Sequence, residues 1–319
     1  MTEKMATRDA YGKTLLALGG ENENIVALDA DLSSSTKTNM FAKEFPQRFF
    51  NMGIAEQNLI GTAAGLSTCG KIPFASTFAI FATGRAFEQV RNTVAYPALN
   101  VKIAATHAGI TVGEDGASHQ AIEDISLMRT LPNLTVIVPA DGFETEQAVR
   151  AAVDIEGPVY LRLGRPAVPM IFDKEYKFIP GEAVTMKTGK DVTLFATGLM
   201  TEKALRAAEM LSDEGIDAEV VHIHTIKPID KESIIRSVSK TGCFVTAEEH
   251  SIIGGLGSAV CEVTSEKCSA PMMRVGIKDR FGESGTPDAL IEKYGLKPHN
   301  LAEAAKTAMK KKSRPCSCC

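Results

Sequence analysis

The sequence has no surplus of positive charge: 35 Lys and Arg stand against 39 Asp and Glu, which gives a formal net charge of −4. A protein that binds nucleic acid through its phosphates needs a basic surface. No basic patch with interleaved aromatic residues is present in the sequence. The composition therefore gives no support to a nucleic-acid-binding function.

Long apolar runs are also lacking. The uncharged runs 57–70 and 72–84 are too short and too polar to span a bilayer. The first eight residues, MTEKMATR, have none of the apolar character of a secretory signal. We therefore expect a cytoplasmic protein without membrane association, and 319 residues with 44% hydrophobic content favour two globular domains.

The seven cysteines are not spaced like those of a disulfide-rich protein. Four cysteines are scattered through the chain, as is typical of reduced thiols in a cytosolic protein. The other three, Cys316, Cys318 and Cys319, end a basic tail that offers no further metal ligands nearby. We interpret the tail, residues 313–319, as a dispensable appendage.

Short apolar segments alternate with helical patterns along the whole chain, which predicts an α/β fold with largely parallel sheets flanked by helices. Residues 1–170 form one predicted domain, 171–190 a linker and 191–312 a second domain. Strands are predicted at 25–30, 49–52, 72–76, 101–106, 135–138, 159–163, 192–196, 218–222, 243–247 and 273–277. Helices are predicted at 8–18, 55–69, 84–95, 122–129, 144–153, 202–212, 231–239, 256–266, 289–293 and 301–311.

Glu56 is the one carboxylate in a nearly uncharged stretch, 49–84, whose only other charged residue is Lys71. It opens the predicted helix 55–69, and the residues three, four and seven positions on, all aliphatic, share its face. Taking a carboxylate out of water favours its acid form, which suits a group that shares a proton with a ligand. The plainer alternative is that Glu56 only complements the positive end of a helix.

Polar or aromatic residues follow several predicted strands at the point where each strand ends. Ligands bind beyond the carboxyl ends of the strands in open parallel sheets, so we expect a site along this edge. The residues concerned are Asp31, Glu56, Phe78, Phe81, His107 and Arg165.

The loop from His107 to Gln120 holds two histidines, two acids and three glycines within its sequence HAGITVGEDGASHQ. A zinc site from His107, Asp115 and His119 has no recognised ligand spacing, and the loop lacks the alternating ligands of a calcium site. Donors and acceptors for a polyhydroxy substrate fit the mixture better.

A glycine-rich turn in the second half, Gly254-Gly-Leu-Gly257, lies between a predicted strand and a helix, as in dinucleotide-binding proteins. The third glycine of that fingerprint is replaced by Val260, and no suitable acidic residue follows. Close packing of a helix, or a subunit contact, explains these glycines better.

Several of these motifs together resemble the C-terminal half of transketolase. Gly53-Ile-Ala-Glu-Gln57 resembles that family's glutamate motif, Thr77-Phe-Ala-Ile-Phe81 its aromatic cofactor segment, and His107–Gln120 its substrate loop. Two segments of the second half, 248–257 and 282–296, are similar to its C-terminal domain. The resemblance covers the chain up to the cysteine tail.

The resemblance implies a thiamine diphosphate enzyme that moves a two-carbon ketol unit from a ketose phosphate to an aldose phosphate, as in the pentose phosphate pathway. Glu56 would hydrogen-bond the pyrimidine ring of the cofactor, with His107 and His119 as further catalytic residues. Phe78, Phe81 and Asp31 would complete the cofactor site. The implied substrate-binding residues are Arg8, Ser35, His107, Asp115, His119 and Arg165.

Two features depart from single-chain transketolases. A third aromatic residue, expected one helical turn after Phe81, is Gly84. The family's domain for the diphosphate and Mg²⁺ is also missing, so we expect the metal ligands on an N-terminal transketolase subunit, in a heterotetramer, with no metal ligand in this chain.

Three other interpretations stay open. One is the beta subunit of a 2-oxo-acid dehydrogenase first component, which has less use for the sugar loop. Another is a fragment of a deoxyxylulose-phosphate-type synthase. The third is a non-catalytic assembly subunit of the same fold. The preferred ketose and aldose, and the pathway, do not follow from the sequence.

Overall fold

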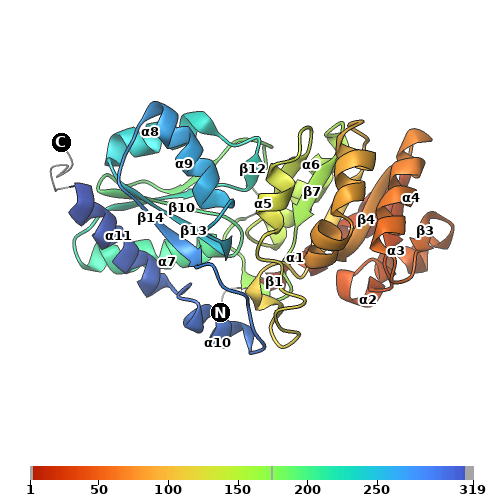
Figure 1. Cartoon of the computed structure of the whole chain (residues 1–319), viewed down its shortest axis with the longest axis horizontal. Coiled ribbons are helices and arrows are strands. Elements are labelled where there is room, and N and C mark those ends of the chain that lie inside the picture. Colours follow the sequence, from red (N-terminus) through yellow and green to blue (C-terminus); the bar gives the residue numbers. More distant parts are fainter. Residues whose placement is uncertain (1–2, 174, 313–319) are drawn as a thin grey trace.

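Two sheets, built from different halves of the chain, lie side by side along the long axis of the molecule (Figure 1). The computed structural model describes residues 3–173 and 175–312. The fold class predicted from the sequence, two domains with largely parallel sheets flanked by helices, is confirmed.

The first sheet has seven strands in the order β12-β6-β7-β5-β4-β2-β3. All neighbours in it are parallel except β12, which is antiparallel to β6. The strands are β2 (Ile25–Asp29), β3 (Phe49–Asn51), β4 (Ile72–Phe78), β5 (Lys102–Thr106), β6 (Thr135–Ile137), β7 (Val159–Arg162) and β12 (Thr225–Lys227).

Helices cover both faces of this sheet because its strands carry apolar side chains that point to both faces in turn. In β2, Ile25 and Ala27 pack with α1 and α6, whereas Val26 and Leu28 pack with α4. The helices of this half are α1 (Thr7–Glu21), α2 (Ser33–Thr36), α3 (Asn39–Glu44), α4 (Glu56–Thr68), α5 (Asp124–Arg129) and α6 (Gly142–Asp154). Shorter turns are the 3₁₀ helices η1 (Pro46–Arg48) and η4 (Ile110–Val112) and the π-helical turns η2 (Phe81–Arg85) and η3 (Gln89–Ala95).

The second sheet has five strands in the order β14-β13-β10-β11-β9, of which only β9 is antiparallel to its neighbour. Its strands are β9 (Val184–Lys187), β10 (Val192–Ala196), β11 (Ala218–His222), β13 (Phe244–Ser251) and β14 (Met272–Ile277). Its helices are α7 (Met200–Asp213), α8 (Lys231–Thr241), α9 (Leu256–Lys267), α10 (Pro287–Lys293) and α11 (Pro298–Lys312). No helix among the described residues combines the length and the apolarity needed to cross a membrane.

Four short strands lie outside the sequence prediction. A two-stranded sheet joins β1 (Lys4–Ala6) to β8 (Ala167–Pro169). The segment expected as a linker contains β9, and β12 leaves the second half to pair with the first sheet. Strands of three or four residues are too short for periodicity to reveal. The expected helix 84–95 is instead two π-helical turns.

We expect β12 to couple the two halves energetically. Ile226 in β12 is buried in the apolar cluster that both halves share, so Ile226→Ala should lower the free energy of unfolding by about 2–5 kcal/mol. Denaturant unfolding followed by circular dichroism measures it. Ile179→Ala, at a side chain that is 47% exposed, is the matched control and should change stability by about 0.5 kcal/mol or less. Equal effects of the two variants would contradict this role of β12.

Candidate functional site

Five adjacent parallel strands, β7, β5, β4, β2 and β3, end at the same edge of the first sheet. Each is followed by a residue that the sequence singles out. These are Arg165 after β7, His107 after β5, Phe78 at the end of β4, Asp31 after β2 and Glu56 after β3. The parallel order therefore aligns segments that are far apart in the chain.

Glu56 is the first residue of α4, and its side chain is 2% exposed. The three aliphatic residues on its helix face are fully buried. Its Oε1 accepts a hydrogen bond from Nη1 of Arg85 at 3.0 Å. Its Oε2 is buried without a hydrogen-bond partner among the described residues. Glu56 thus has one oxygen paired and one oxygen available to a donor.

Aromatic rings line the space beside this carboxylate. The rings of Phe78 and Phe81 are nearly parallel, with centroids 5.9 Å apart. The imidazole of His107 stacks on Phe78 at 3.8 Å, and that of His119 meets Phe81 edge-on at 5.3 Å. The guanidinium of Arg85 lies 4.5 Å from the centre of the Phe81 ring. Four residues from the predicted cofactor and substrate sets, together with Arg85, therefore form one cluster.

His107 is neutral and its tautomer is fixed by two neighbours. Arg8 can only donate, so the 3.0 Å contact from its Nη1 makes Nε2 of His107 an acceptor. Nδ1 then carries the proton and donates to Oγ1 of Thr106, 2.9 Å away. Burial, and then the positive charge of Arg8, lower the pKa of His107 to about 3. The backbone at His107 has a positive φ of 59°.

Two arginines lie at this edge, Arg8 against His107 and Arg165 after β7. Arg8 also donates to the backbone carbonyl of Ser35 at 3.2 Å, while its Nε is buried without a partner among the described residues. Burial lowers the pKa of Arg8, and the nearby charge of Arg165 lowers it further. Arg165 faces the loop carboxylates of Glu114, at 3.5 Å, and Asp115, at 3.9 Å. Two guanidinium groups close together favour binding of a negatively charged group.

Asp31 is held by Asn51, a residue to which sequence reasoning gave no role. The Asn51 amide donates to Asp31 at 3.1 Å and accepts from the backbone N–H groups of Asp31, at 3.1 Å, and Gly53, at 3.0 Å. Asn51 lies two residues before the motif Gly53–Gln57, and this position was the available signal for it. Arg85 was also missed, although it is the first charged residue after Lys71.

No three His, Cys, Asp or Glu side chains in residues 3–173 and 175–312 gather in a way that could hold a metal ion.

The glycine-rich turn before α9 binds a carboxylate of the chain itself through backbone N–H groups. Glu248 accepts from the backbone N–H groups of Leu256, at 2.7 Å, and Gly257, at 2.9 Å. A Cβ at Gly255 would lie 1.9 Å from Oε2 of Glu248, so the glycine permits this close packing.

Comparison with known families gives two adjacent matches. The model "Transketolase, pyrimidine binding domain" matches residues 3–170, and "Transketolase, C-terminal domain" matches residues 181–301. The chain therefore carries a pyrimidine-binding domain of the transketolase type followed by a transketolase C-terminal domain.

Individual proteins are similar over nearly the whole chain. The "Putative transketolase C-terminal section" of Methanocaldococcus jannaschii is 53% identical, over 95% of this chain and 96% of its own length. A "6-deoxy-6-sulfo-D-fructose transketolase subunit" of Clostridium is 44% identical, over 96% and 95%. The solved structure "Split gene transketolase, inactive beta4 tetramer" is 61% identical, with a TM-score of 0.91 over 97% of this chain and 99% of that chain. The chain belongs to the transketolase family.

We expect His107 to remain neutral far below the usual range of a histidine. Because burial and Arg8 both disfavour the imidazolium, the Nδ1–H tautomer should persist from pH 8 down to about pH 4. Nitrogen-detected NMR titration, assigned with His107→Asn, measures this. Arg8→Met should raise the pKa of His107 while leaving it below 6.5, because burial remains. Titration of wild-type His107 near pH 6.5 would contradict this description of the site.

Proposed function

We propose that this chain is the pyrimidine-side catalytic subunit of a split, thiamine diphosphate-dependent transketolase. The reaction transfers a two-carbon ketol unit from a ketose phosphate to an aldose phosphate. The observation that carries the proposal is the buried carboxylate of Glu56, with one oxygen unpartnered among the described residues, beside the rings of Phe78 and Phe81.

The residues present fit the aromatic half of thiamine diphosphate. A pyrimidine ring offers an apolar face and ring nitrogens, and the cluster offers aromatic faces and a buried carboxyl oxygen. When bound, thiamine diphosphate supplies the nucleophilic carbon and stabilises the electron pair released from the ketose. Glu56 would share a proton with a pyrimidine ring nitrogen, and Asp31 would lie beside the bound cofactor.

Sugar binding falls to the other residues of the edge. Arg8 and Arg165, with Ser35, would hold the anionic end of the sugar, a phosphate in this proposal. The name of the Clostridium relative indicates a sulfonated sugar, which also carries an anionic end. His107, His119 and Asp115 would bind hydroxyl groups. Because His107 is neutral, it would add no charge to the sugar site.

The diphosphate and the Mg²⁺ that accompanies it need ligands from another chain. The described residues hold no cluster of carboxylates and histidines suited to a metal ion. An N-terminal transketolase subunit would supply these ligands, and two copies of each chain would form a heterotetramer. The similar split-gene transketolase was solved as a β4 tetramer that is described as inactive, which supports the need for a partner.

Glu56 should be essential for turnover and dispensable for folding. In the complex with the partner, Glu56→Gln removes the shared proton but keeps the shape, so turnover should fall by ~10²–10⁴. The matched control is Glu88→Gln, at an exposed carboxylate after η2, which should keep normal turnover. A ketol-transfer assay at saturating cofactor measures both variants. Near-normal turnover of Glu56→Gln would sink the mechanism.

The lone chain should neither bind thiamine diphosphate tightly nor turn over. Calorimetric titration of thiamine diphosphate and Mg²⁺ into the purified chain, with and without an N-terminal transketolase subunit, tests the division of the site. We expect metal-dependent binding and ketol transfer in the mixture only. Tight binding and turnover by the chain alone would overturn the split-enzyme proposal.

Assays of the mixture of the two subunits, thiamine diphosphate and Mg²⁺ also distinguish this proposal from its alternatives. Transfer of an acyl group to lipoamide in place of an aldose phosphate would indicate the beta subunit of a 2-oxo-acid dehydrogenase component. Binding of the partner without any turnover would indicate an assembly subunit.

A further inference from the structure

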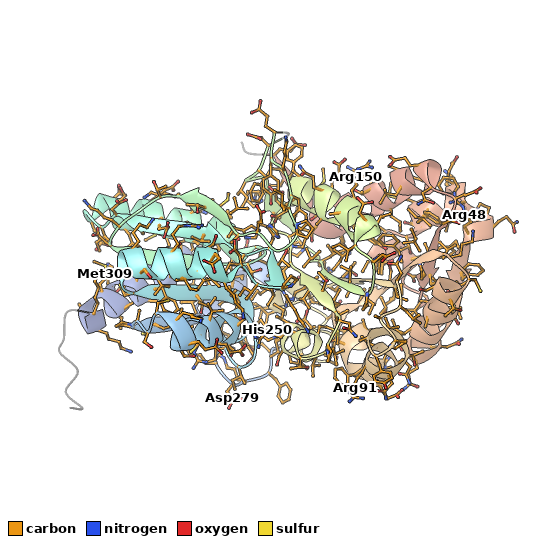
Figure 2. All side chains as sticks on the ribbon, turned by 90° about the horizontal axis from the view of Figure 1, so that it is seen from above. Arg48, Arg91, Arg150, His250, Asp279 and Met309 are labelled. Carbon is orange, nitrogen blue, oxygen red and sulfur yellow. The ribbon has the colours of Figure 1, made fainter. Side chains whose placement is uncertain are left out.

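Residues of the second half of the chain form hydrogen bonds to the backbone near both ends of the substrate loop, His107–Gln120. Strand β13 ends at the junction between the two halves, where Figure 2 shows His250. Its Ser251 N–H donates to the carbonyl of Ile122 at 2.7 Å, directly after the loop. Nε2 of His250 accepts from the backbone N–H of Ser126 at 3.3 Å. The exit of the loop is therefore fixed to β13.

Glu249 holds the other end of the loop. Its Oε1 accepts a hydrogen bond from the backbone N–H of Thr111 at 2.7 Å, and its side chain is 4% exposed. A Cβ added at Gly109 would lie 2.2 Å from the Glu249 carboxyl carbon, so the loop backbone packs directly on this group. Gly109 has a φ of 81°, which only glycine adopts easily. His107 lies two residues before this contact.

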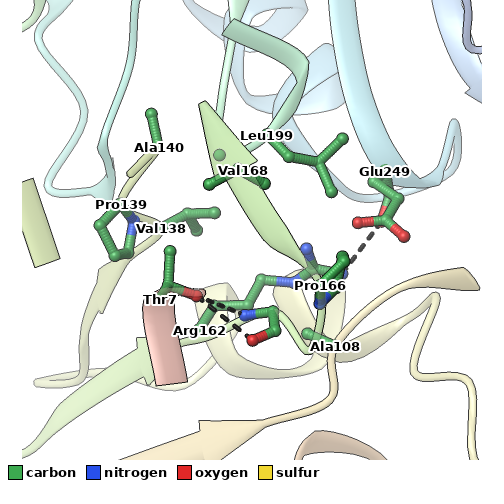
Figure 3. Close-up of a pocket in the computed structure, with 12 residues that line it drawn as sticks. Thr7, Ala108, Val138, Pro139, Ala140, Arg162, Pro166, Val168, Leu199 and Glu249 are labelled. Carbon is green, nitrogen blue, oxygen red and sulfur yellow. Dashed lines mark hydrogen bonds between the residues drawn. The ribbon is translucent and has the colours of Figure 1, made fainter. Parts of the chain in front are cut away.

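Glu249 is itself fixed from the first half. Arg162, the last residue of β7, donates from Nη2 to the Glu249 backbone carbonyl at 3.0 Å, which Figure 3 shows as a dashed line. The same guanidinium makes a buried ion pair with Asp124, with Nε 2.7 Å from Oδ2. The cavity at this junction is only about 20 Å³ in volume and is lined by Arg162 and Glu249, so it is too small for a metabolite. The contacts of this cluster fit a role in positioning.

The last residue of the loop, Gln120, and its middle, at Gly116, touch the second half as well. Nε2 of Gln120 donates to the carbonyl of Glu283 at 2.9 Å, and a Cβ at Gly116 would lie 2.6 Å from the hydroxyl of Ser284. The loop thus rests on the second half at both ends and in its middle. These contacts use the loop backbone and the Gln120 side chain, and none of them uses the side chains of His107, Asp115 or His119.

We propose that Glu249 is a positioning residue: it fixes the backbone of Gly109–Thr111 and thereby sets the place of His107 and the rest of the substrate loop. The second half of the chain then acts as the template on which the sugar-binding loop is formed. The effect on sugar kinetics rests on the proposed transketolase function, whereas the effect on the loop does not. Arg162 and Asp124 hold Glu249 in place.

Glu248 offers a matched control on the same strand. It is a neighbouring buried glutamate, and burial raises the pKa of both side chains to about 7. Its carboxylate, however, accepts from N–H groups at the start of α9 and lies 3.6 Å from Nδ1 of His250, all within its own half. Loss of either carboxylate therefore removes similar chemistry from the same strand, but only Glu249 reaches the loop.

Amide hydrogen exchange in the full-length chain tests the loop directly. Glu249→Ala should speed exchange in the peptide that covers 107–113, since the Thr111 N–H loses its acceptor, and should leave 255–260 unchanged. Glu248→Ala should do the reverse. Glu249→Gln keeps an acceptor oxygen and should stay close to wild type. Equal protection of 107–113 in wild type and Glu249→Ala would overturn the proposal, and so would equal loss there in both alanine variants.

Kinetics in the complex with the partner subunit, thiamine diphosphate and Mg²⁺ test the consequence. Because a misplaced loop loses alignment with the sugar, Glu249→Ala should lower kcat/KM for the ketose by about 10- to 100-fold, mainly through KM. Glu248→Ala should keep the wild-type KM, and Glu249→Gln should restore most of it. An unchanged ketose KM in Glu249→Ala would overturn the positioning role. Absence of ketol transfer by the wild-type complex would instead refute the proposed function, while the exchange measurement would still decide the role of Glu249.

Discussion

The site depends on the parallel alignment of five strands. Parallel strands end at one edge, so residues as distant in sequence as Asp31 and Arg165 are brought to the same edge of the sheet. Three of these strands, β2, β5 and β7, are buried on both faces, which keeps this edge rigid. Rigidity matters because the polar groups come from loops, and loops hold a geometry only when their ends are fixed.

The buried ion pair between Arg162 and Asp124 extends that alignment to the second half. Removing two charges from water is costly, and the cost is offset only when the remaining donors are also satisfied. Here Tyr160 donates to Asp124 at 2.7 Å, and Arg162 also donates to backbone carbonyls of both halves. The pair therefore joins the two halves through hydrogen bonds whose donors and acceptors are matched. An apolar junction of the same size would allow more orientations.

Much of the fold was predictable because its periodicity is strong. The core strands and long helices came within a few residues of their observed bounds, since buried strands and amphipathic helices show clear spacing. The strand β12 could not be found in this way, because three residues carry no period and its partner lies in the other half. The π-helical turns after Phe78 resemble an ordinary helix in sequence for a related reason: apolar spacing does not record one extra residue per turn.

The candidate site was predictable in its residues and not in their contacts. Glu56, Phe78 and His107 could be found from charge isolation and from the ends of strands. The pairing of Arg8 with His107 could not, because the two are 99 residues apart and no local pattern connects them. Glu249 was visible only as part of a motif, and its reach to Thr111 follows from how β13 meets the first half.

Arginines of the chain itself pair with two of the site residues: Arg85 with Glu56, and Arg8 with His107. These pairs bear on how a ligand could enter. Arg85 neutralises Glu56 and covers Phe81, yet its side chain is 50% exposed. Because Glu56 is buried, a ligand that displaces Arg85 has to offer the Glu56 carboxylate a donor of its own. Arg8 differs, because it is partly buried and is also bonded to Ser35 and His107. The position of Arg8 is thus fixed by two hydrogen bonds within the chain, whereas that of Arg85 depends on its pairing with Glu56 and its contact with Phe81.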